Sequence, residues 1–352
     1  MSNWLKARND RQFREKLLIR EKVVDGIRSF FKQQGFHEVE TPLLVQHPGT
    51  EPYLEVFETE LKVAGAGSKR GFLLTSPELA MKKLLSAGFG NIFQICKSFR
   101  NQEGLSSFHN PEFTILEWYR TEADYRAIME DCEQLLLHLH RQIHGAAGGN
   151  ILTYQGREYD LATPWERISV AEAFAKYGGI DLETMLSEEK LLEAAAKKGY
   201  QLTDTHTWEQ AYHQLFLNEI EPNLGQAAPT IIYDYPASQA ALSKKKADDP
   251  RLAERFEFYL AGLELGNAFS ELTDAAEQKE RMLKELRERK DLGKTEFALD
   301  KEFIQALELG LPETGGIAVG VDRLVMLFAD ASSVSETLLF PIQDVFAFPE
   351  EQ

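Results

Sequence analysis

Several chemically useful side chains fall in the segment "FRNQEGLSSFHNPEFTILEWY". Arg100 ends one apolar run, and Glu103 follows it in the intervening loop. In the next run Phe113, Glu117 and Tyr119 share one parity, so an extended strand would place them on one face. Together they offer a flat ring for stacking a base, a guanidinium fork for a phosphate or carboxylate, and carboxylates for an amine. The same residues could also form an ordinary half-exposed strand.

A second acidic segment, "ERFEFYLAGLELGNAFSELTD", contains Glu257 and Glu264. If residues 260–261 form a two-residue hairpin loop, positions 257 and 264 face each other and both carboxylates project from one face. Mg²⁺ carrying substrate phosphates would compensate this like-charge pair, because it takes one or two carboxylates plus phosphate oxygens. A plain strand cannot keep Glu271 on the same face, whereas a bulge at Gly266 would. Alternatively, both glutamates are solvated on an outer face.

The segment "GGIAVGVDRLVMLFAD" predicts a glycine-punctuated strand that runs into an apolar helix. Arg323 falls in the first helical turn, where the helix dipole disfavours a cation by some tenths of a kcal/mol. A positive side chain beside free backbone donors is favourable if an anion binds there. An arginine at a helix start is also common without any ligand.

These residues need a framework, and the pattern predicts an antiparallel sheet flanked by helices, an α+β fold, because strands and helices do not alternate strictly. Apolar spacing predicts helices at 11–34, stopped by Gly35, and near 124–143. Ser76 is a candidate N-cap, with Pro77 at the first helical position. The remaining predicted strands are "FHEVETPLL" up to Pro42, "TIIYDYP", "RFEFYLAGLELGNAF" and "GGIAVGVD".

Residues from about 146 to 225 differ in character from the rest of the chain. The run "ILTYQGREYDL" predicts a short hairpin, and two Ala-, Glu- and Lys-rich helices follow at about 187–199 and 207–219. We therefore predict catalytic-core segments at 1–145 and 226–352 and an insertion at 146–225.

Composition limits the class of protein. A chain of 352 residues suits one large core with an insertion, or two domains. The formal net charge of -17 disfavours non-specific binding to nucleic acid, although solubility alone is the simpler explanation of this charge. Cys96 and Cys132 lack metal-ligand spacing and fit a reducing cytoplasm. The charged N-terminus has no signal-peptide core, and no run approaches the roughly 18 apolar residues of a membrane span. We expect a cytoplasmic protein that does not bind a membrane.

Three segments resemble, in order, the three motifs of the class II aminoacyl-tRNA synthetases: "GFHEVETPLL", "FRNQE" with "FHNPEF", and "GVDRLVMLF". "TSPEL", "HNPEFTILEWY" and "ELGNAFSELTDA" resemble the lysine-specific branch. Within that branch, "YDYPASQAALS", "LEWYR" and "GIAVGVDRLVML" are similar to the elongation factor P lysyltransferases, truncated paralogues of lysyl-tRNA synthetase. The similarity runs from about residue 12 to 330. It implies a class II catalytic core without an N-terminal OB-fold domain, and a homodimer built on the first motif.

The resemblance also implies roles at an ATP site. Arg100 would bridge the amino-acid carboxylate and the α-phosphate, and Arg323 would hold the γ-phosphate, which makes both catalytic. Glu257 and Glu264 match the carboxylates that bind Mg²⁺ with ATP. Further ATP contacts are implied for Glu103, His109, Asn110, Phe113, Leu265 and Gly320.

For the amino acid, the resemblance implies that Ser76 and Glu78 hold the α-amine and that Asn267 helps with the carboxylate. Glu117, Tyr119 and Glu271 would enclose the side-chain ammonium of lysine. Such a site should reject an analogue without the terminal amine by roughly 10⁴-fold or more, because its buried carboxylates would go unpaired. Ala318 stands where the full-length synthetase usually has glycine, which implies a pocket reshaped for another isomer such as (R)-β-lysine.

The implied function is an ATP-dependent ligase that makes a lysyl adenylate and transfers the acyl group to the ε-amine of a lysine on elongation factor P. Only about twenty residues precede the first motif, too few for the anticodon-binding OB-fold domain, so no tRNA anticodon binding is expected. The alternatives are a minimal lysyl-tRNA synthetase that charges tRNA, an asparagine synthetase of the same fold, and a non-catalytic paralogue that only binds ligand.

Overall fold

An eight-stranded sheet forms the centre of the protein in a computed structural model that describes residues 2–104, 106–145, 149–201 and 207–346. In spatial order the strands are β1 (His37–Glu38), β5 (Ile92–Phe99), β6 (Glu112–Thr121), β13 (Thr314–Gly320), β12 (Leu263–Ser270), β11 (Leu252–Leu260), β10 (Thr230–Pro236) and β9 (Glu166–Ser169). The edge pairs β1–β5 and β10–β9 are parallel, and every inner pair is antiparallel. The predicted α+β fold with an antiparallel sheet is confirmed.

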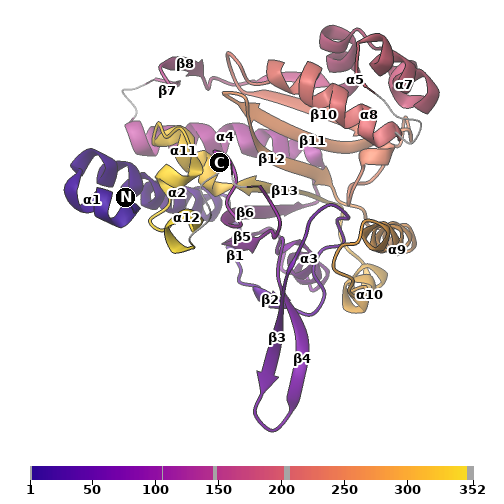
Figure 1. Ribbon diagram of the computed structural model, residues 1–352, viewed down its shortest axis with the longest axis horizontal. Coiled ribbons are helices and arrows are strands. Elements are labelled where there is room, and N and C mark those ends of the chain that lie inside the picture. The colour runs from indigo at the N-terminus through magenta and orange to yellow at the C-terminus, as the bar shows by residue number, and fades with distance from the viewer. Residues whose placement is uncertain (1, 105, 146–148, 202–206, 347–352) are drawn as a thin grey trace.

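Helices α2 (Arg11–Gln33), α4 (Tyr125–His144) and α11 (Val321–Phe328) pack against one face of the sheet (Figure 1). The largest apolar cluster lies between them and includes Leu116 and Trp118 of β6, both 0% exposed. The Asp10 side chain caps α2 by accepting from the Phe13 amide at 3.1 Å, and Asp124 caps α4 in the same way. The helices predicted at 11–34 and 124–143 are confirmed.

The opposite face of the sheet is only partly covered by helices. Helices α3 (Glu78–Ser86), α9 (Ala275–Asp291) and α10 (Lys301–Leu309) pack together over its β5–β6 end and share a smaller apolar cluster with Ile92 and Tyr119 (Figure 1). Because side chains alternate along a strand and Leu116 and Trp118 enter the main core, Glu117 and Tyr119 point toward this second face. The residues with predicted chemistry on β6 therefore lie on the less covered side.

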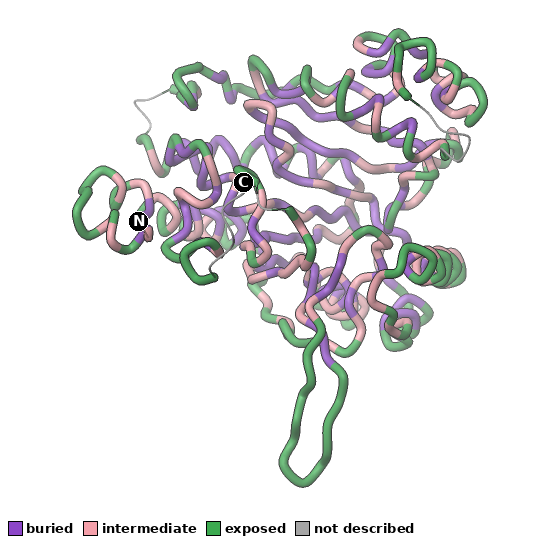
Figure 2. Tube along the Cα trace, viewed as in Figure 1, coloured by how far each residue is buried: buried purple, intermediate pink, exposed green. Residues whose placement is uncertain are grey.

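A three-stranded sheet of β2 (Leu44–Val45), β4 (Gly67–Leu73) and β3 (Phe57–Val63) lies beside the main sheet. Strands β3 and β4 project from the body as a hairpin, visible as the exposed arm in Figure 2. Every residue of β3 after Phe57 is exposed, so this arm adds little to the core.

The segment from residue 149 to 225 contributes to two apolar clusters. The predicted hairpin is confirmed as β7 (Ile151–Tyr154) and β8 (Arg157–Asp160), which adds Tyr154 and Tyr159 to the main core. Helices α5 (Val170–Ala173), α6 (Leu182–Leu186), α7 (Glu188–Lys197) and α8 (Trp208–Leu215) surround a second cluster that rests on β10 and β11. The two predicted helices are thus confirmed, although α8 continues to Ile220 only as a π-helical turn. Residues 146–148 and 202–206 of the predicted insertion lie outside the described part, and its boundaries stay a prediction.

Two local predictions were wrong in their extent. The strand expected over "FHEVETPLL" is reduced to His37–Glu38, because this edge segment pairs with β5 alone and Pro42 has no amide hydrogen to donate. Helix α3 begins at Glu78, so Pro77 is its N-cap and Ser76 lies one position further out. The Ser76 hydroxyl oxygen still accepts a hydrogen bond from the Glu78 amide at 3.0 Å.

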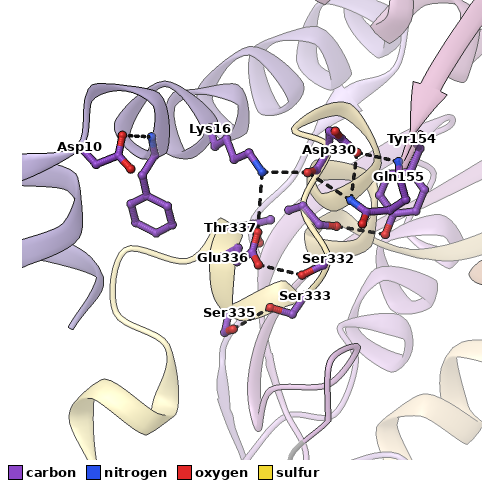
Figure 3. A network of polar contacts seen from close by, with 12 residues as sticks. Asp10, Lys16, Tyr154, Gln155, Asp330, Ser332, Ser333, Ser335, Glu336 and Thr337 are labelled. Carbon is purple, nitrogen blue, oxygen red and sulfur yellow. Dashed lines mark hydrogen bonds and ion pairs between the residues drawn. The ribbon is translucent and has the colours of Figure 1, made fainter. Parts of the chain in front are cut away.

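Polar contacts, shown in Figure 3, tie α2 and the β7–β8 turn to the segment that follows α11. Lys16 of α2 donates to the backbone oxygen of Asp330 at 2.9 Å, just after α11. The Asp330 carboxylate accepts from the Gln155 amide at 2.7 Å, and the Tyr154 hydroxyl donates to the Ala331 oxygen at 3.0 Å. Short helices α1 (Asn3–Asn9) and α12 (Ile342–Val345) complete this corner of the molecule. The end of α11 is therefore held by both α2 and the β7–β8 turn.

Candidate active site

A cavity of about 310 Å³ opens on the second face of the sheet. Strand register builds its floor: Ala318 of β13 pairs with Glu117 of β6 on one side and with Asn267 of β12 on the other. Residues paired across strands share a face, so these three side chains line the same floor. All the site residues predicted from the sequence line this cavity, with the exception of Glu257.

One end of the cavity is acidic and deeply buried. Glu117 is 1% exposed, and its two carboxylate oxygens accept from the Ser76 hydroxyl at 2.6 Å and the Tyr119 hydroxyl at 3.0 Å. The start of α3 positions Ser76, because the Ser76 oxygen also accepts from the first amide of that helix. The three predicted residues therefore form one connected group.

A lysine that the sequence reasoning missed lies behind this acidic end. Lys82 of α3 is 1% exposed, and its Nζ lies 2.5 Å from Glu78 Oε1 and 2.5 Å from Glu271 Oε2. The signal that could have revealed half of this contact is the i,i+4 spacing of Glu78 and Lys82 on the predicted helix. The link to Glu271 joins segments far apart in the sequence, so helical spacing could not reveal it.

The carboxylates at this end are short of positive charge. Burial, reinforced by the neighbouring Glu78, raises the pKa of Glu117 to about 8, although Ser76, Tyr119 and Lys82 act against the rise. Burial also raises the pKa of Glu271 to about 7, with Lys82 opposing it and Glu78 adding to it. An ammonium ion placed among these groups would favour their ionised forms, so the pocket suits an amine.

Gly316 of β13 makes this arrangement possible. A β-carbon at that position would lie 2.3 Å from Glu271 Oε1 and 2.5 Å from the Tyr119 ring. Any larger residue would therefore push apart two of the predicted ammonium ligands. The sequence analysis noted the glycines of this strand without assigning Gly316 a role.

The other end of the cavity carries a cation and an aromatic ring. The Arg100 guanidinium lies 5.0 Å from the centroid of the Phe113 ring, and its Nη1 is 3.6 Å from Glu103. Its buried Nε–H has no hydrogen-bond partner among the described residues. Arg100 thus keeps a donor available for an anion that enters the cavity.

Arg323 is held at the cavity wall by Glu264 and His109, and its Nη1 also lies 3.6 Å from the Glu264 carboxylate. Its Nη1 donates to the backbone oxygen of Glu264 at 2.6 Å, and its Nη2 lies 3.0 Å from His109 Nε2. Burial and the nearby Arg323 lower the pKa of His109, so the neutral ring accepts from Arg323 and its Nδ1–H faces the Ser106 oxygen at 2.8 Å. Asn110 lines the same region, but its amide donates to the Glu112 oxygen and its oxygen accepts from the Ile342 amide.

The β11–β12 hairpin differs in register from the prediction. Its loop is residues 261–262, and Glu257 pairs with Asn267, so the expected direct pairing of Glu257 with Glu264 was wrong. A bulge does occur, at Leu265, one position before the expected Gly266. Because one extra residue resets the alternation, Glu264 shares its face with Asn267 and Glu257.

The two glutamates of this hairpin are not equivalent. Glu257 is 8% exposed, and its oxygens accept from Arg255 at 2.6 Å and the Tyr259 hydroxyl at 2.8 Å. Burial and the charge of Glu257 raise the pKa of Glu264, which lines the cavity, to about 7. A divalent cation bound with phosphates fits Glu264, because such an ion needs only one or two protein carboxylates. Within the described residues, no group of three or more His, Cys, Asp or Glu side chains could hold a metal alone.

The Asn267 side chain joins the two ends. Its oxygen accepts from Arg255 Nε at 3.0 Å, which leaves its NH₂ group to face the cavity beside Ala318. The cavity can therefore hold ammonium groups at one end, a carboxylate near Arg100 and Asn267, and a phosphorylated aromatic ligand at the other end. This order of groups suits the joining of an amino-acid carboxylate to a nucleotide phosphate.

Comparison with known proteins shows which sequences this chain is similar to. Residues 1–344 match the family described as tRNA synthetases class II (D, K and N). The chain is 40% identical over 329 residues to "Elongation factor P--(R)-beta-lysine ligase" of Mannheimia succiniciproducens, covering 93% of this chain and 95% of that protein. The protein of the same name from Proteus mirabilis is 40% identical over 331 residues, covering 93% and 94%.

Longer relatives are similar to the same degree. "Lysine--tRNA ligase" of Chloroflexus aurantiacus is 38% identical over 335 residues, covering 94% of this chain. The chain spans only 66% of the length of that ligase. Across the described residues, no helix combines the length and the apolar character needed to cross a membrane.

Proposed function

Because this chain belongs to the class II tRNA synthetases (D, K and N), we propose that it is an ATP-dependent, AMP-forming ligase for lysine. The observation that carries the proposal is the acidic group of Glu78, Glu117 and Glu271 at one end of a cavity that has Arg100 and Arg323 at the other. Family membership supports the use of ATP, and the three carboxylates support lysine as the amino acid. In this proposal the residues that line the cavity keep the roles that the sequence resemblance implied. Mg²⁺ is assigned to Glu264, because Glu257 does not line the cavity and pairs with Arg255.

The first half-reaction forms an adenylate. A carboxylate oxygen of lysine attacks the α-phosphorus of ATP, the bond to the β-phosphate breaks, and pyrophosphate leaves. Arg100 holds the carboxylate against the α-phosphate, and Arg323 holds the γ-phosphate, so both stabilise charge that develops during transfer. Mg²⁺ bound at Glu264 would neutralise phosphate charge and orient the leaving group.

The second half-reaction joins lysine to a protein. The ε-amine nitrogen of a lysine on elongation factor P attacks the carbonyl carbon of the adenylate, AMP leaves, and the amine loses a proton as the amide forms. This acceptor is supported by the names of relatives that match this chain over nearly their whole length. The net charge of -17 further disfavours a nucleic-acid acceptor.

The proposed isomer is (R)-β-lysine, and Ala318 is the residue that supports it. Its methyl group lies between Glu117 and Asn267, the predicted ligands of the terminal ammonium and the carboxylate. A methyl group there fills space beside the backbone of the bound amino acid. It can therefore favour β-lysine, whose amine is on the β-carbon, over α-lysine. We further propose a homodimer in the cytoplasm, by analogy with the family.

Charging of tRNA with lysine is the second candidate, because the 38% identical relative is a lysine--tRNA ligase. ATP–pyrophosphate exchange with α-lysine, (R)-β-lysine and aspartate tests the first half-reaction. Labelled amino acid is then offered to elongation factor P and to tRNA. Exchange with a lysine isomer and label on elongation factor P would support the proposal, and stable label on tRNA would favour the second candidate. No exchange with any substrate would leave a ligand-binding paralogue.

A further inference from the structure

We propose that Lys82 is a specificity-determining positioning residue, a resident ammonium that fixes Glu78 and Glu271 and sets the charge of the amino-acid pocket. The inference rests on the proposed function, because it concerns how the pocket reads a substrate with two amines. It assigns a role to a residue that does not itself line the cavity and that lies outside the motifs described above.

The position of Lys82 separates it from the substrate. Glu78 and Glu271 line the cavity, whereas Lys82 does not and is 1% exposed. Its Nζ lies 2.5 Å from an oxygen of each carboxylate. A buried ammonium is costly unless it is paired, and here two carboxylates pair with it at once. Lys82 therefore lies behind the two carboxylates and fixes their separation.

The two carboxylates that Lys82 joins belong to different parts of the predicted substrate site. Glu78 is the predicted ligand of the α-amine, and Glu271 is a predicted ligand of the terminal ammonium. Because one ammonium bridges them, the distance between the two amine positions is held by α3 and by the residue that directly follows β12. A shift of Glu78 or Glu271 would misplace one amine relative to the other.

The charges around Lys82 also match a diamino acid. Glu78, Glu117 and Glu271 carry a formal charge of -3 when ionised, and Lys82 reduces the sum to -2. Two ammonium groups of a bound lysine isomer neutralise that remainder, while the substrate carboxylate is left to Arg100 and Asn267. Without Lys82, one buried carboxylate would take up a proton or turn away.

Two other acidic residues belong to the same cavity, and burial, helped by the charge of Glu78, raises the pKa of each. Glu51 and Glu285 line the cavity, and Thr50 donates to Glu285. Lys82 contacts neither of them; its described ion pairs are with Glu78 and Glu271. At Glu78 and Glu271 themselves, the described ion pairs that supply positive charge are those of Lys82.

A double-mutant cycle of Lys82→Met and Glu271→Gln tests this role through the kinetics of ATP–pyrophosphate exchange. We expect Lys82→Met to raise KM for the lysine isomer about tenfold or more while KM for ATP changes less than about twofold. The double variant restores the formal charge of -2. Its KM for the lysine isomer should therefore rise no more than that of Glu271→Gln alone. Lys83→Met is the matched control, because Lys83 is the next residue of α3 and pairs with Asp300 outside this group.

The outcomes separate the two proposals. If the wild-type protein activates neither lysine isomer, the proposed function fails. If the wild type is active but the two substitutions have additive effects, or Lys82→Met leaves KM unchanged, the role of Lys82 is overturned. Thermal unfolding shows whether each variant is folded. If Lys82→Met does not fold, Lys82→Gln takes its place in the cycle.

Discussion

Single residues decide which ligand the acidic end can accept. Glu117 combines near-complete burial with a pKa raised to about 8 by burial and by Glu78, and among the described residues only hydroxyl groups donate to its oxygens. Such a carboxylate is costly when ionised and alone, and it gains most when an ammonium ion binds. The preference for an amine therefore has two sources. One is the cost of an ionised, unpaired Glu117 in the empty site, and the other is the contacts that the ammonium makes once it is bound.

Glu117→Gln should lower kcat/KM for lysine activation by about 10²-fold or more, because the substrate ammonium would lose a buried charged partner. ATP–pyrophosphate exchange at saturating ATP measures this effect. The control is Glu112→Gln on the same strand, where the carboxylate is 51% exposed and pairs with Lys97. Equal losses in the two variants would contradict a specific role for Glu117.

Strand β13 and helix α11 fix the positions of these residues, and the close packing around β13 leaves little room for larger side chains. Strand β13 passes between β6 and β12, so each of its residues has a neighbour on both sides, and the glycines on it decide how close side chains from those strands can come. Helix α11 follows β13 directly and carries Arg323 to the cavity wall. Changes in either element should therefore affect one end of the cavity selectively.

Gly316→Ala should raise KM for lysine about tenfold or more and leave KM for ATP nearly unchanged, because the new methyl group would displace Glu271 and Tyr119. Steady-state exchange kinetics, with each substrate varied in turn, would show the split. Gly104→Ala serves as the comparison, since nothing lies within 4 Å of a β-carbon there. A parallel rise in both KM values would mean that the sheet as a whole had shifted.

The start of α11 depends on Asp322, which is 4% exposed. Its carboxylate accepts from the Thr114 amide of β6 at 2.9 Å and pairs with Arg20 of α2. Asp322→Asn should lower the free energy of unfolding by about 1.5–3 kcal/mol, the usual contribution of hydrogen bonds to a charged group. Denaturant unfolding measures this loss. Glu15→Gln, which removes an exposed pair with Arg11, should cost much less, because water screens that pair.

At the scale of the whole molecule, the acidic site opposes folding stability as pH rises. Burial raises the pKa of Glu117 to about 8 and that of Glu271 to about 7, from an ordinary value of 4.5. The folded protein thus holds more protons than the unfolded chain in this range. The stability from these groups is fully present below about pH 4.5 and is lost as pH rises through 7 to 8.

Bound lysine should restore that stability, because its ammonium groups pair with the carboxylates that have lost protons. The rise in Tm on adding saturating lysine should therefore be larger at pH 8 than at pH 6, measured by thermal unfolding with and without the ligand. The Glu117→Gln/Glu271→Gln variant should show a smaller dependence on pH. A ligand effect that is the same at both pH values would argue against ammonium binding at these carboxylates.

The sequence by itself determined much of the local structure and the list of residues that meet in the cavity. Helix caps at Asp10 and Asp124, the alternation of β6 and the glycine-rich β13 depend on neighbours a few residues apart, which a linear pattern records. For that reason the parity of Phe113, Glu117 and Tyr119 predicted a shared face, and the structure confirms it.

Only the tertiary structure decided how strands and helices combine. The bulge at Leu265 depends on pairing between β11 and β12, and the pairing of Glu257 with Arg255 depends on which face is buried. The bridge from Lys82 to Glu271 and the closeness of Gly316 to that same carboxylate join segments more than forty residues apart. Register and packing are collective properties, since each contact depends on the position of whole elements, and so spacing along one chain could not reveal them.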